Sequence, residues 1–285
     1  MITVATRKSP LARIQTNTAV CLLSEALPDE SFQILPIVTE IDSRLDYSLE
    51  TQGGNGLFTK ELDHALLNKT ADIAIHSAKD LPIELADSLV IAGYTARESI
   101  ADCLVSRVER HLIKQIATSS PRRREQLKEI FPDAKFKLIR GNVGTRLQKI
   151  ANGEADATLL AEAGLNRLEI YEHEGLSFIN LEVDLMVPAA GQGAIAVVCR
   201  SGDEARYRPH LCDQTFSAVS LEKACLKVLD GGCQSPAGLY FDGTHLHIFH
   251  PSIAYNCLKI EGNTAMEKEA FAVEQVQLIR HRINE

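Results

Sequence analysis

Arginine residues gather at turns between the strands and helices that this sequence predicts. In the densest example, TSSPRRR at 118–124, hydroxyl side chains and a proline suited to a first helical turn precede three arginines. The arginines at such turns, with their small or hydroxyl neighbours, are Arg7 with Ser9, Thr118 and Ser119 with Arg122 and Arg123, Arg140 with Arg146, and Gly164 with Arg167. Guanidinium groups and helix N-termini both bind oxyanions, so the set predicts an acidic ligand. For any single arginine the alternative is a solvated surface charge.

A second candidate follows an apolar stretch at 72–76, where His76, Lys79 and Asp80 come close together. A carboxylate at the end of a buried strand can act as a general acid or base, or can stabilise a developing cation. The alternative is a capped turn with a Lys79–Asp80 surface pair, and the pattern by itself favours this alternative slightly.

A third candidate is Cys233, directly after two glycines, where an open turn exposes a nucleophilic thiol. The alternative is a small apolar residue in a turn. We expect the other six cysteines (21, 103, 199, 212, 225 and 257) to be buried structural residues. No cysteine or histidine cluster has metal-ligand spacing, and no phosphate-binding glycine motif occurs, so no metal site is predicted.

The elements that position these residues alternate between strand and helix patterns. Strands are expected at 2–5, 32–38, 72–76, 157–161 and 194–199, the last two as parallel strands buried on both faces. A helix opens at Ser9 and places Ile14, Cys21 and Leu22 on one face, and another places Phe58, Leu62, Ala65 and Leu66 together. This alternation predicts an α/β fold.

The pattern changes after residue 211. A helical stripe at 221–229 ends at a glycine pair, short strands are expected at 238–241, 246–249 and 258–261, and a final helix carries apolar residues at 272, 276, 279 and 283. These elements predict a small α+β module.

Composition excludes several classes of protein. The 285 residues are 45% hydrophobic and 24% charged, which excludes a disordered chain, a collagen and a disulfide-dense mini-protein. With 30 basic and 38 acidic residues the net charge is −8, so nucleic acid is not an expected partner. Seven cysteines without C-x-x-C spacing, no signal-peptide pattern and no membrane-length apolar run predict a cytoplasmic protein.

Seven segments, in order and from end to end, resemble the porphobilinogen deaminase (hydroxymethylbilane synthase) family. They are ATRKSPLA at 5–12, GLFTKEL at 56–62, DIAIHSAKD at 72–80, TSSPRR at 118–123, LIRGNVGTRL at 138–147, PAAGQGA at 188–194 and LDGGCQSP at 229–236. The resemblance implies two α/β lobes like those of periplasmic binding proteins, formed by residues 1–93 with 187–210 and by residues 94–186, and a C-terminal α+β domain at 211–285. It also implies a monomer.

The resemblance implies an enzyme that condenses four porphobilinogen units, with loss of ammonia, on a dipyrromethane cofactor bound covalently to Cys233. Asp80 matches the catalytic aspartate, and Arg7, Arg140 and Arg167 match substrate-binding positions. The cofactor-binding positions are matched by Ser9, Lys79, Thr118, Ser119, Arg122, Arg123, Arg146, Gly164 and Gln192. Since pyrrole acetate and propionate groups are anionic, these arginines suit such ligands.

The sequence departs from the family pattern at Glu40, Ile41 and Asn55, and the stretch 105–116 looks shorter than usual. The polar, glycine-containing loop at 43–56 is expected to act as a mobile lid, or alternatively to be a surface loop without a role. Two other functions remain open. A non-catalytic, two-lobed binding protein for a small carboxylate or oxyanion would not need Cys233, and a pseudoenzyme would not need both Asp80 and Cys233.

Overall fold

The computed structural model describes residues 1–39, 59–229 and 235–284. The chain forms two compact units, each built from two stretches of sequence. Unit 1 consists of Met1–Glu98 and Gly193–Ser217, and unit 2 of Ser99–Gln192 and Ala218–Glu285.

Unit 1 is built on a five-stranded sheet in the order β2-β1-β3-β10-β4. The strands are β1 (Ile2–Arg7), β2 (Phe32–Ile37), β3 (Ile73–Ser77), β4 (Leu89–Tyr94) and β10 (Ile195–Arg200). β1 runs parallel to β2 and β3, whereas β10 runs antiparallel to both of its neighbours. The prediction that residues 194–199, which form β10, are a parallel strand was therefore wrong. A strand buried on both faces has the same apolar composition whether it runs parallel or antiparallel to its neighbours.

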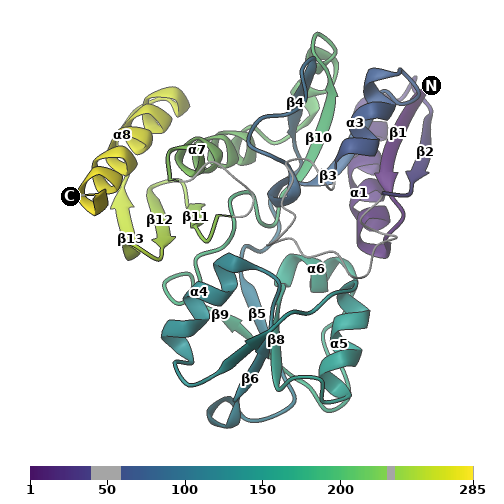
Figure 1. The fold of residues 1–285 in the computed structure, drawn as a ribbon. Helices are drawn as coiled ribbons and strands as arrows, with labels where there is room; N and C mark the ends of the chain where they lie inside the picture. The colour runs from purple at the N-terminus through teal and green to yellow at the C-terminus, as the bar shows by residue number, and fades with distance from the viewer. Residues whose placement is uncertain (40–58, 230–234, 285) are drawn as a thin grey trace. The chain divides into compact units, whose positions relative to one another are not determined.

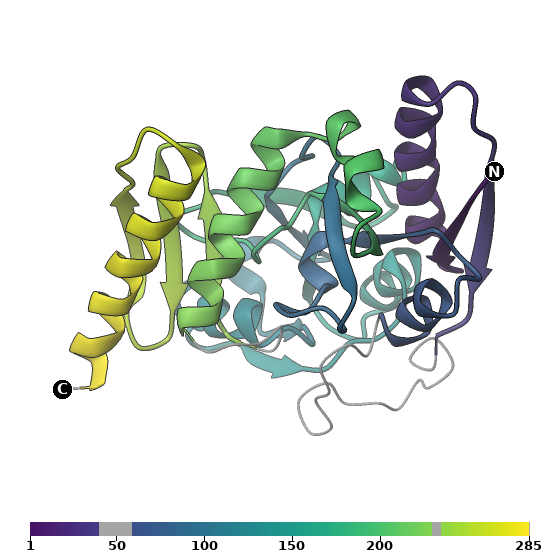
Figure 2. The ribbon, with the colours of Figure 1, turned by 90° about the horizontal axis from the view of Figure 1, so that it is seen from above.

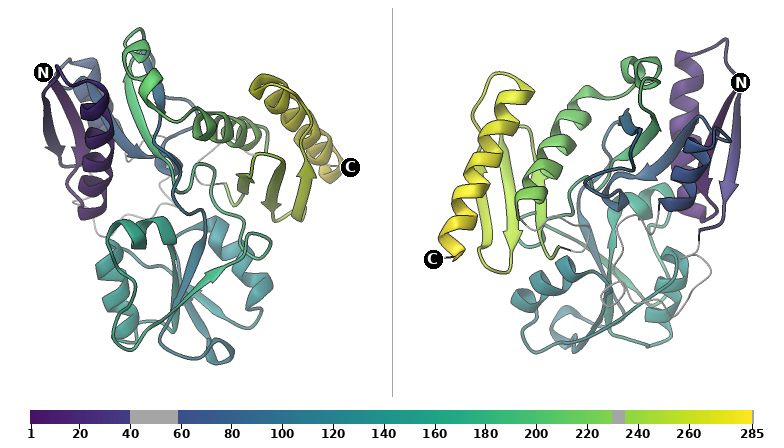
Figure 3. Two further views of the ribbon diagram at one scale, coloured as in Figure 1. Left: turned by 180° about the vertical axis from the view of Figure 1, so that it is seen from behind. Right: turned by 45° about the horizontal axis from the view of Figure 1, so that its top comes forward.

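Helices cover both faces of this sheet. Helix α1 (Pro10–Ala26) begins at the N-cap Ser9 and packs Ala19 and Leu23 on one face; α3 (Lys60–Leu67) packs on the sheet through Leu62 and Leu66. Figure 3 shows α1 alongside β1 and β2. The predicted apolar face of α1 was wrong, because its buried residues are Gln15, Thr16, Ala19 and Leu23. Gln15 and Thr16 are buried because they hydrogen-bond to Ser77 and Thr6.

Unit 2 contains a second five-stranded sheet in the order β7-β6-β8-β5-β9. Its strands are β5 (Asp102–Ser106), β6 (Gln115–Ala117), β7 (Lys135–Lys137), β8 (Ala157–Ala161) and β9 (Ser177–Leu181). Its helices are α4 (Pro121–Ile130), α5 (Val143–Ala151) and α6 (Glu162–Arg167). Leu127 of α4 packs on one face of the sheet, and Leu147 of α5 and Leu165 of α6 pack on the other (Figure 1). β8 is parallel to β6 but antiparallel to β5, so it is parallel on one side only.

The C-terminal elements are α7 (Asp213–Leu229), β11 (Gly238–Phe241), β12 (His245–His250), β13 (Ala254–Lys259) and α8 (Ala265–Asn284). The three strands form an antiparallel sheet, and Figure 2 shows α8 running along one of its faces beside α7. β13 begins at Ala254, four residues before the predicted strand, because a short turn pairs Ala254 directly with His250. The fold class expected from the sequence, α/β with a small α+β module, is confirmed.

Short 3-10 turns complete the described chain: η1 (Ala78–Asp80), η2 (Arg110–Leu112), η3 (Glu204–Arg206) and η4 (Arg208–His210). Within the described ranges, no helix is long and apolar enough to cross a membrane.

The cysteine prediction was correct for three residues. Cys103, Cys199 and Cys225 are buried, and burial raises the pKa of the first thiol to about 11 and of the other two to about 12. It was wrong for Cys21 and Cys257, which are exposed, and Cys212 is half-buried. Cys21 lies on the outer side of α1, and Cys257 lies on β13, one of the two edge strands of its sheet. An apolar residue type does not by itself determine which face of an element is covered.

Candidate functional site

In unit 1, Asp80 lies on a turn that buried neighbours hold on both sides. β3 ends at Ser77, and the next backbone N–H, that of Ala78, donates to the Ala194 carbonyl over 3.0 Å. Ala78 and Leu81 have no exposed surface, whereas Lys79 and Asp80 are half-buried. The turn is therefore anchored in the core, while the Asp80 carboxylate remains accessible to solvent.

The predicted ligands Arg7 and Ser9 lie at the end of the adjacent strand. Arg7 is the last residue of β1 and is half-buried. The Ser9 hydroxyl accepts the Ala12 N–H over 3.3 Å and so caps α1. In this structure Ser9 starts a helix directly after the strand that carries Arg7, as the Ser-Pro pair predicted.

His76 is a buried residue of β3 to which the sequence gave no role of its own. Burial, and to a smaller extent the charge of Arg7, lower its pKa from 6.5 to about 3, so the imidazole is neutral at physiological pH. Its Nε2 atom has no hydrogen-bond partner among the residues that the structure describes. The register of β1 and β3, which pairs Ala5 with Ala74, brings Arg7 and His76 to the same end of the sheet.

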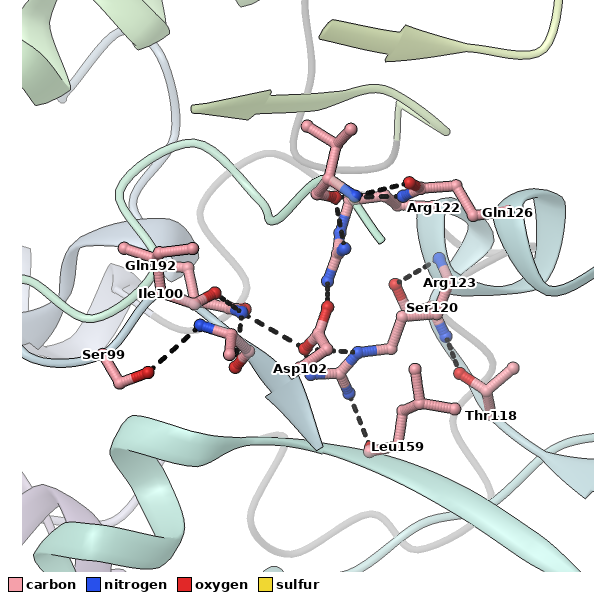
Figure 4. Close-up of polar contacts among 12 residues, drawn as sticks. Ser99, Ile100, Asp102, Thr118, Ser120, Arg122, Arg123, Gln126, Leu159 and Gln192 are labelled. Atoms are coloured by element: carbon pink, nitrogen blue, oxygen red, sulfur yellow. Dashed lines mark hydrogen bonds and ion pairs between the residues drawn. The ribbon is translucent and has the colours of Figure 1, made fainter. Parts of the chain in front are cut away.

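In unit 2, the predicted cofactor ligands Arg122 and Arg123 converge on one carboxylate, that of Asp102 (Figure 4). An Arg122 Nη atom donates to Asp102 Oδ2 over 2.7 Å, and Arg123 donates to Oδ1 from Nε and Nη over 3.1 and 2.6 Å. Asp102 has no exposed surface, and both arginines are buried. Burial lowers the pKa of Arg122, and the Asp102 carboxylate opposes that shift.

Gln192, a third predicted cofactor ligand, joins the same cluster. Its Nε2 atom donates to the Ile100 carbonyl over 2.8 Å and lies 3.2 Å from Asp102 Oδ1. The structure thus gathers Arg122, Arg123 and Gln192 around Asp102. The sequence indicated the three ligands but missed Asp102, because nothing in the spacing relates the start of β5 to a helix 20 residues later.

The hydroxyl residues before α4 organise the start of that helix. Ser120 is the N-cap, and its hydroxyl accepts the Arg123 N–H. Thr118 is buried, and its hydroxyl accepts the Ser120 N–H over 3.1 Å, while the half-buried Ser119 donates to the Ile139 carbonyl over 2.6 Å. These bonds hold the turn that brings Arg122 and Arg123 to Asp102.

A second turn carries Arg140 and Arg146, both half-buried. Burial lowers the pKa of Arg140. Arg146 Nε donates to the Gly141 carbonyl over 2.8 Å, and the N-cap Asn142 accepts the Thr145 N–H over 2.9 Å. Gly141 has φ +115°, and a Cβ atom there would lie 2.6 Å from the Thr145 side chain, so the turn requires glycine.

The remaining predicted residues fall into two groups. Gly164 is buried inside α6, and Arg167 is the last residue of that helix, so Arg167 lies at a helix C-terminus. Cys233 and the loop at 43–56 lie outside the described residues. Within the described part of the chain, no group of three or more His, Cys, Asp or Glu side chains could hold a metal ion.

Unit 1 therefore presents the accessible Asp80 carboxylate and the half-buried Arg7, and unit 2 presents the arginine-rich turns. A model of a known protein family, described as "Porphobilinogen deaminase, dipyromethane cofactor binding domain", matches residues 2–208. The chain belongs to the porphobilinogen deaminase family. This match confirms the family that the seven sequence segments indicated.

Curated members of the porphobilinogen deaminase family align with most of the chain. The deaminase of Bacillus pumilus is 42% identical over 247 residues, covering 84% of this chain and 79% of its own length. That of Rickettsia rickettsii is 39% identical over 274 residues, covering 92% and 77%. Among solved structures, the aliphatic sulphonate binding protein of Escherichia coli is a distant match, with 14% identity, a TM-score of 0.44, and coverage of 79% of this chain and 69% of its own.

Proposed function

We propose that this chain is a porphobilinogen deaminase, a transferase that condenses four porphobilinogen units on a covalently bound dipyrromethane and releases ammonia and the linear tetrapyrrole hydroxymethylbilane. The observation that carries the proposal is the family match over residues 2–208, which include Asp80 and all of the predicted arginines. The relatives are named as deaminases, so a non-catalytic binding protein is not better supported.

Asp80 is the proposed catalytic residue. It is half-buried on an anchored turn, so its oxygens are both accessible and restrained. A carboxyl group in this position can donate a proton to the departing amine, and the resulting carboxylate can stabilise the positive charge that develops on the pyrrole. A turn fixed by Ala78 and Leu81 holds these oxygens without a rearrangement at each cycle.

The residues of unit 2 fit a dipyrromethane group, which carries acetate and propionate carboxylates. Arg122 and Arg123 share one counter-ion, so their cluster keeps one positive charge. Arg140 and Arg146 add two half-buried guanidinium groups, next to a helix N-terminus. We propose that these residues, with Thr118, Ser119, Gly164 and Gln192, hold the cofactor, which supplies the pyrrole carbon to which the first unit is added.

On unit 1, we propose that Arg7, Ser9 and Lys79 bind ligand carboxylates beside Asp80, and that Arg167 of unit 2 binds substrate. The half-buried Arg7 and Lys79 suit this role, because a partly desolvated cation binds a carboxylate more strongly than an exposed one. Ser9 already caps α1 through its hydroxyl, so its part in ligand binding requires the lone pair that the cap leaves.

The test of the proposed function is the intact mass of the protein purified from a host with a working pathway. The adduct on Cys233 should have the mass of two porphobilinogen units less two ammonia. Cys233→Ser should lack the adduct, and Cys225→Ser, which changes a buried cysteine of α7, should keep it. Wild-type protein that carries only bare polypeptide and releases no ammonia from porphobilinogen would overturn the proposal.

Other features of the enzyme are proposed on the sequence expectations alone. We propose three domains with the boundaries given above, a monomer in the cytoplasm, and a lid formed by residues 43–56. Limited proteolysis, sedimentation and hydrogen exchange with and without porphobilinogen test the domains, the monomer and the lid in turn. Exchange at 43–56 as slow as in β3, with or without ligand, would contradict the lid.

A further inference from the structure

Asp102 is the first residue of β5 and has no exposed surface. Burying a charged carboxylate in a protein interior is costly unless the charge has partners. Both of its oxygens bind guanidinium groups. Oδ2 accepts Arg122, and Oδ1 accepts two N–H groups of Arg123. We propose that Asp102 is a positioning residue that orients both arginines for a carboxylate of the dipyrromethane group; this inference rests on the proposed function.

Each guanidinium group is held from two directions. Arg122 also donates to the Val187 carbonyl over 2.7 Å, and Arg123 donates to the Leu159 carbonyl over 2.8 Å. Gln126 secures the first of these acceptors, since it donates to the Val187 carbonyl and accepts the Val187 N–H. Two long side chains with many rotamers are thus ordered by the protein itself, so a ligand does not have to order them.

The charges of the cluster do not balance. In the described structure, the ion pairs of Arg122 and Arg123 are both made with Asp102, which leaves two positive charges against one negative charge. The Arg122 and Arg123 side chains are only 5% and 9% exposed, so water screens the excess charge poorly. Buried charges are normally paired, so this cluster is suited to receive one further anion.

The ligand chemistry that this cluster selects is a single carboxylate. With Asp102 present, one ligand carboxylate brings the cluster to neutrality. Without Asp102, the two adjacent cations would repel each other, and the guanidinium groups of Arg122 and Arg123 would lose the common acceptor that aligns them. Asp102 itself does not need to touch the ligand, because it acts through the two arginines.

The experiment compares Asp102→Asn and Asp102→Glu with a matched control, Asp156→Asn. Asp156 is also a carboxylate of unit 2 with a structural role, since it accepts the N–H groups of Lys114 and Gln115 over 3.0 and 2.9 Å and pairs with Arg107. For each protein we would measure the melting temperature, the fraction of chains with the adduct by intact mass, and the rate at which cofactor-free protein assembles the adduct from porphobilinogen.

We expect folded Asp102→Asn to assemble the adduct at least tenfold more slowly than wild type. Asp102→Glu, which keeps the charge, should recover part of that rate. Asp156→Asn should keep the wild-type rate per folded molecule even if its melting temperature falls. If Asp102→Asn does not fold, Asp102→Glu decides, with an expected rate clearly below that of Asp156→Asn.

Three results would overturn the inference: a wild-type assembly rate in folded Asp102→Asn, equal rates in folded Asp102→Asn and Asp102→Glu, or equal rates in Asp102→Glu and Asp156→Asn. A different result bears on the proposed function. If wild type and Asp156→Asn also lack the adduct, the deaminase assignment fails, whatever the role of Asp102.

Discussion

The turn after β3 in unit 1 and the start of β5 in unit 2 each carry an aspartate, but the two carboxylates differ in their exposure to solvent. Asp80 is half-buried on a turn whose neighbours fill the core. Asp102 is fully buried, and its oxygens bind Arg122, Arg123 and Gln192. The same residue type is therefore accessible to solvent in one region and is an internal counter-ion in the other.

This difference shows what burial does to a carboxylate. An accessible carboxylate can exchange partners and protons with a substrate, so its loss should reduce turnover and leave stability nearly unchanged. A buried carboxylate with two cationic partners cannot be removed without leaving those cations uncompensated, so its loss should reduce stability.

The largest effect is expected for Asp80→Asn. The amide can supply neither the proton nor the negative charge, so single-turnover ammonia release should fall by roughly 100- to 1000-fold. Asp80→Glu should keep weak activity, because the carboxylate is displaced by about one methylene. Both variants should melt close to wild type. Near-normal turnover in Asp80→Asn, or a large loss of stability in both Asp80 variants, would mean that Asp80 only caps a turn.

For Asp102→Asn the expected loss is in stability. Removing the shared partner of two buried guanidinium groups should lower the free energy of unfolding by about 3–5 kcal/mol. Chemical denaturation of Asp102→Asn and Asp80→Asn, with the signal of each unit followed separately, gives the comparison. Equal stabilities of the two variants would contradict the contrast between the two regions.

A smaller effect concerns pH, through His76 of β3. The pKa of this imidazole is about 3 in the folded protein and 6.5 without burial, so the unfolded chain binds the proton first as pH falls. The contribution of His76 to stability is therefore complete above pH 6.5 and decreases by about 1.4 kcal/mol per pH unit toward pH 3.

The measurement is the free energy of unfolding between pH 7 and pH 4.5 in wild type and in His76→Gln. Wild type should lose about 2–3 kcal/mol more than the variant over this range. Parallel pH profiles for the two proteins would show that His76 is not the group that titrates.

The smallest effect is chemical and tests whether both units are packed equally well. At pH 8, the buried thiols of Cys199 in unit 1 and of Cys103 and Cys225 in unit 2 should react with iodoacetamide at least about 100-fold more slowly than Cys21 and Cys257. Peptide mass spectrometry assigns each rate. Fast alkylation of Cys199 alone would mean that unit 1 opens locally more often than unit 2. The solvent accessibility of Asp80 would then result from that local opening.

Much of this protein was determined locally by the sequence. Ser9 and Ser120 each precede a proline, and each caps a helix, because a cap depends only on residues three positions away. The end of β3 at Ser77, and with it the place of Asp80, follows from the apolar residues just before it. The family motifs identified the arginine turns for the same reason, since each motif is a continuous stretch of chain.

Other features depended on the tertiary structure. The direction of β10 follows from the strands on either side of it, and its own apolar residues do not encode it. The buried face of α1 contains Gln15 and Thr16 because Ser77 and Thr6 offer partners there. Asp102 becomes the counter-ion of Arg122 and Arg123 only when the fold brings the first turn of α4 to the start of β5, since a charge is stabilised by its neighbours in space, which the local sequence does not specify.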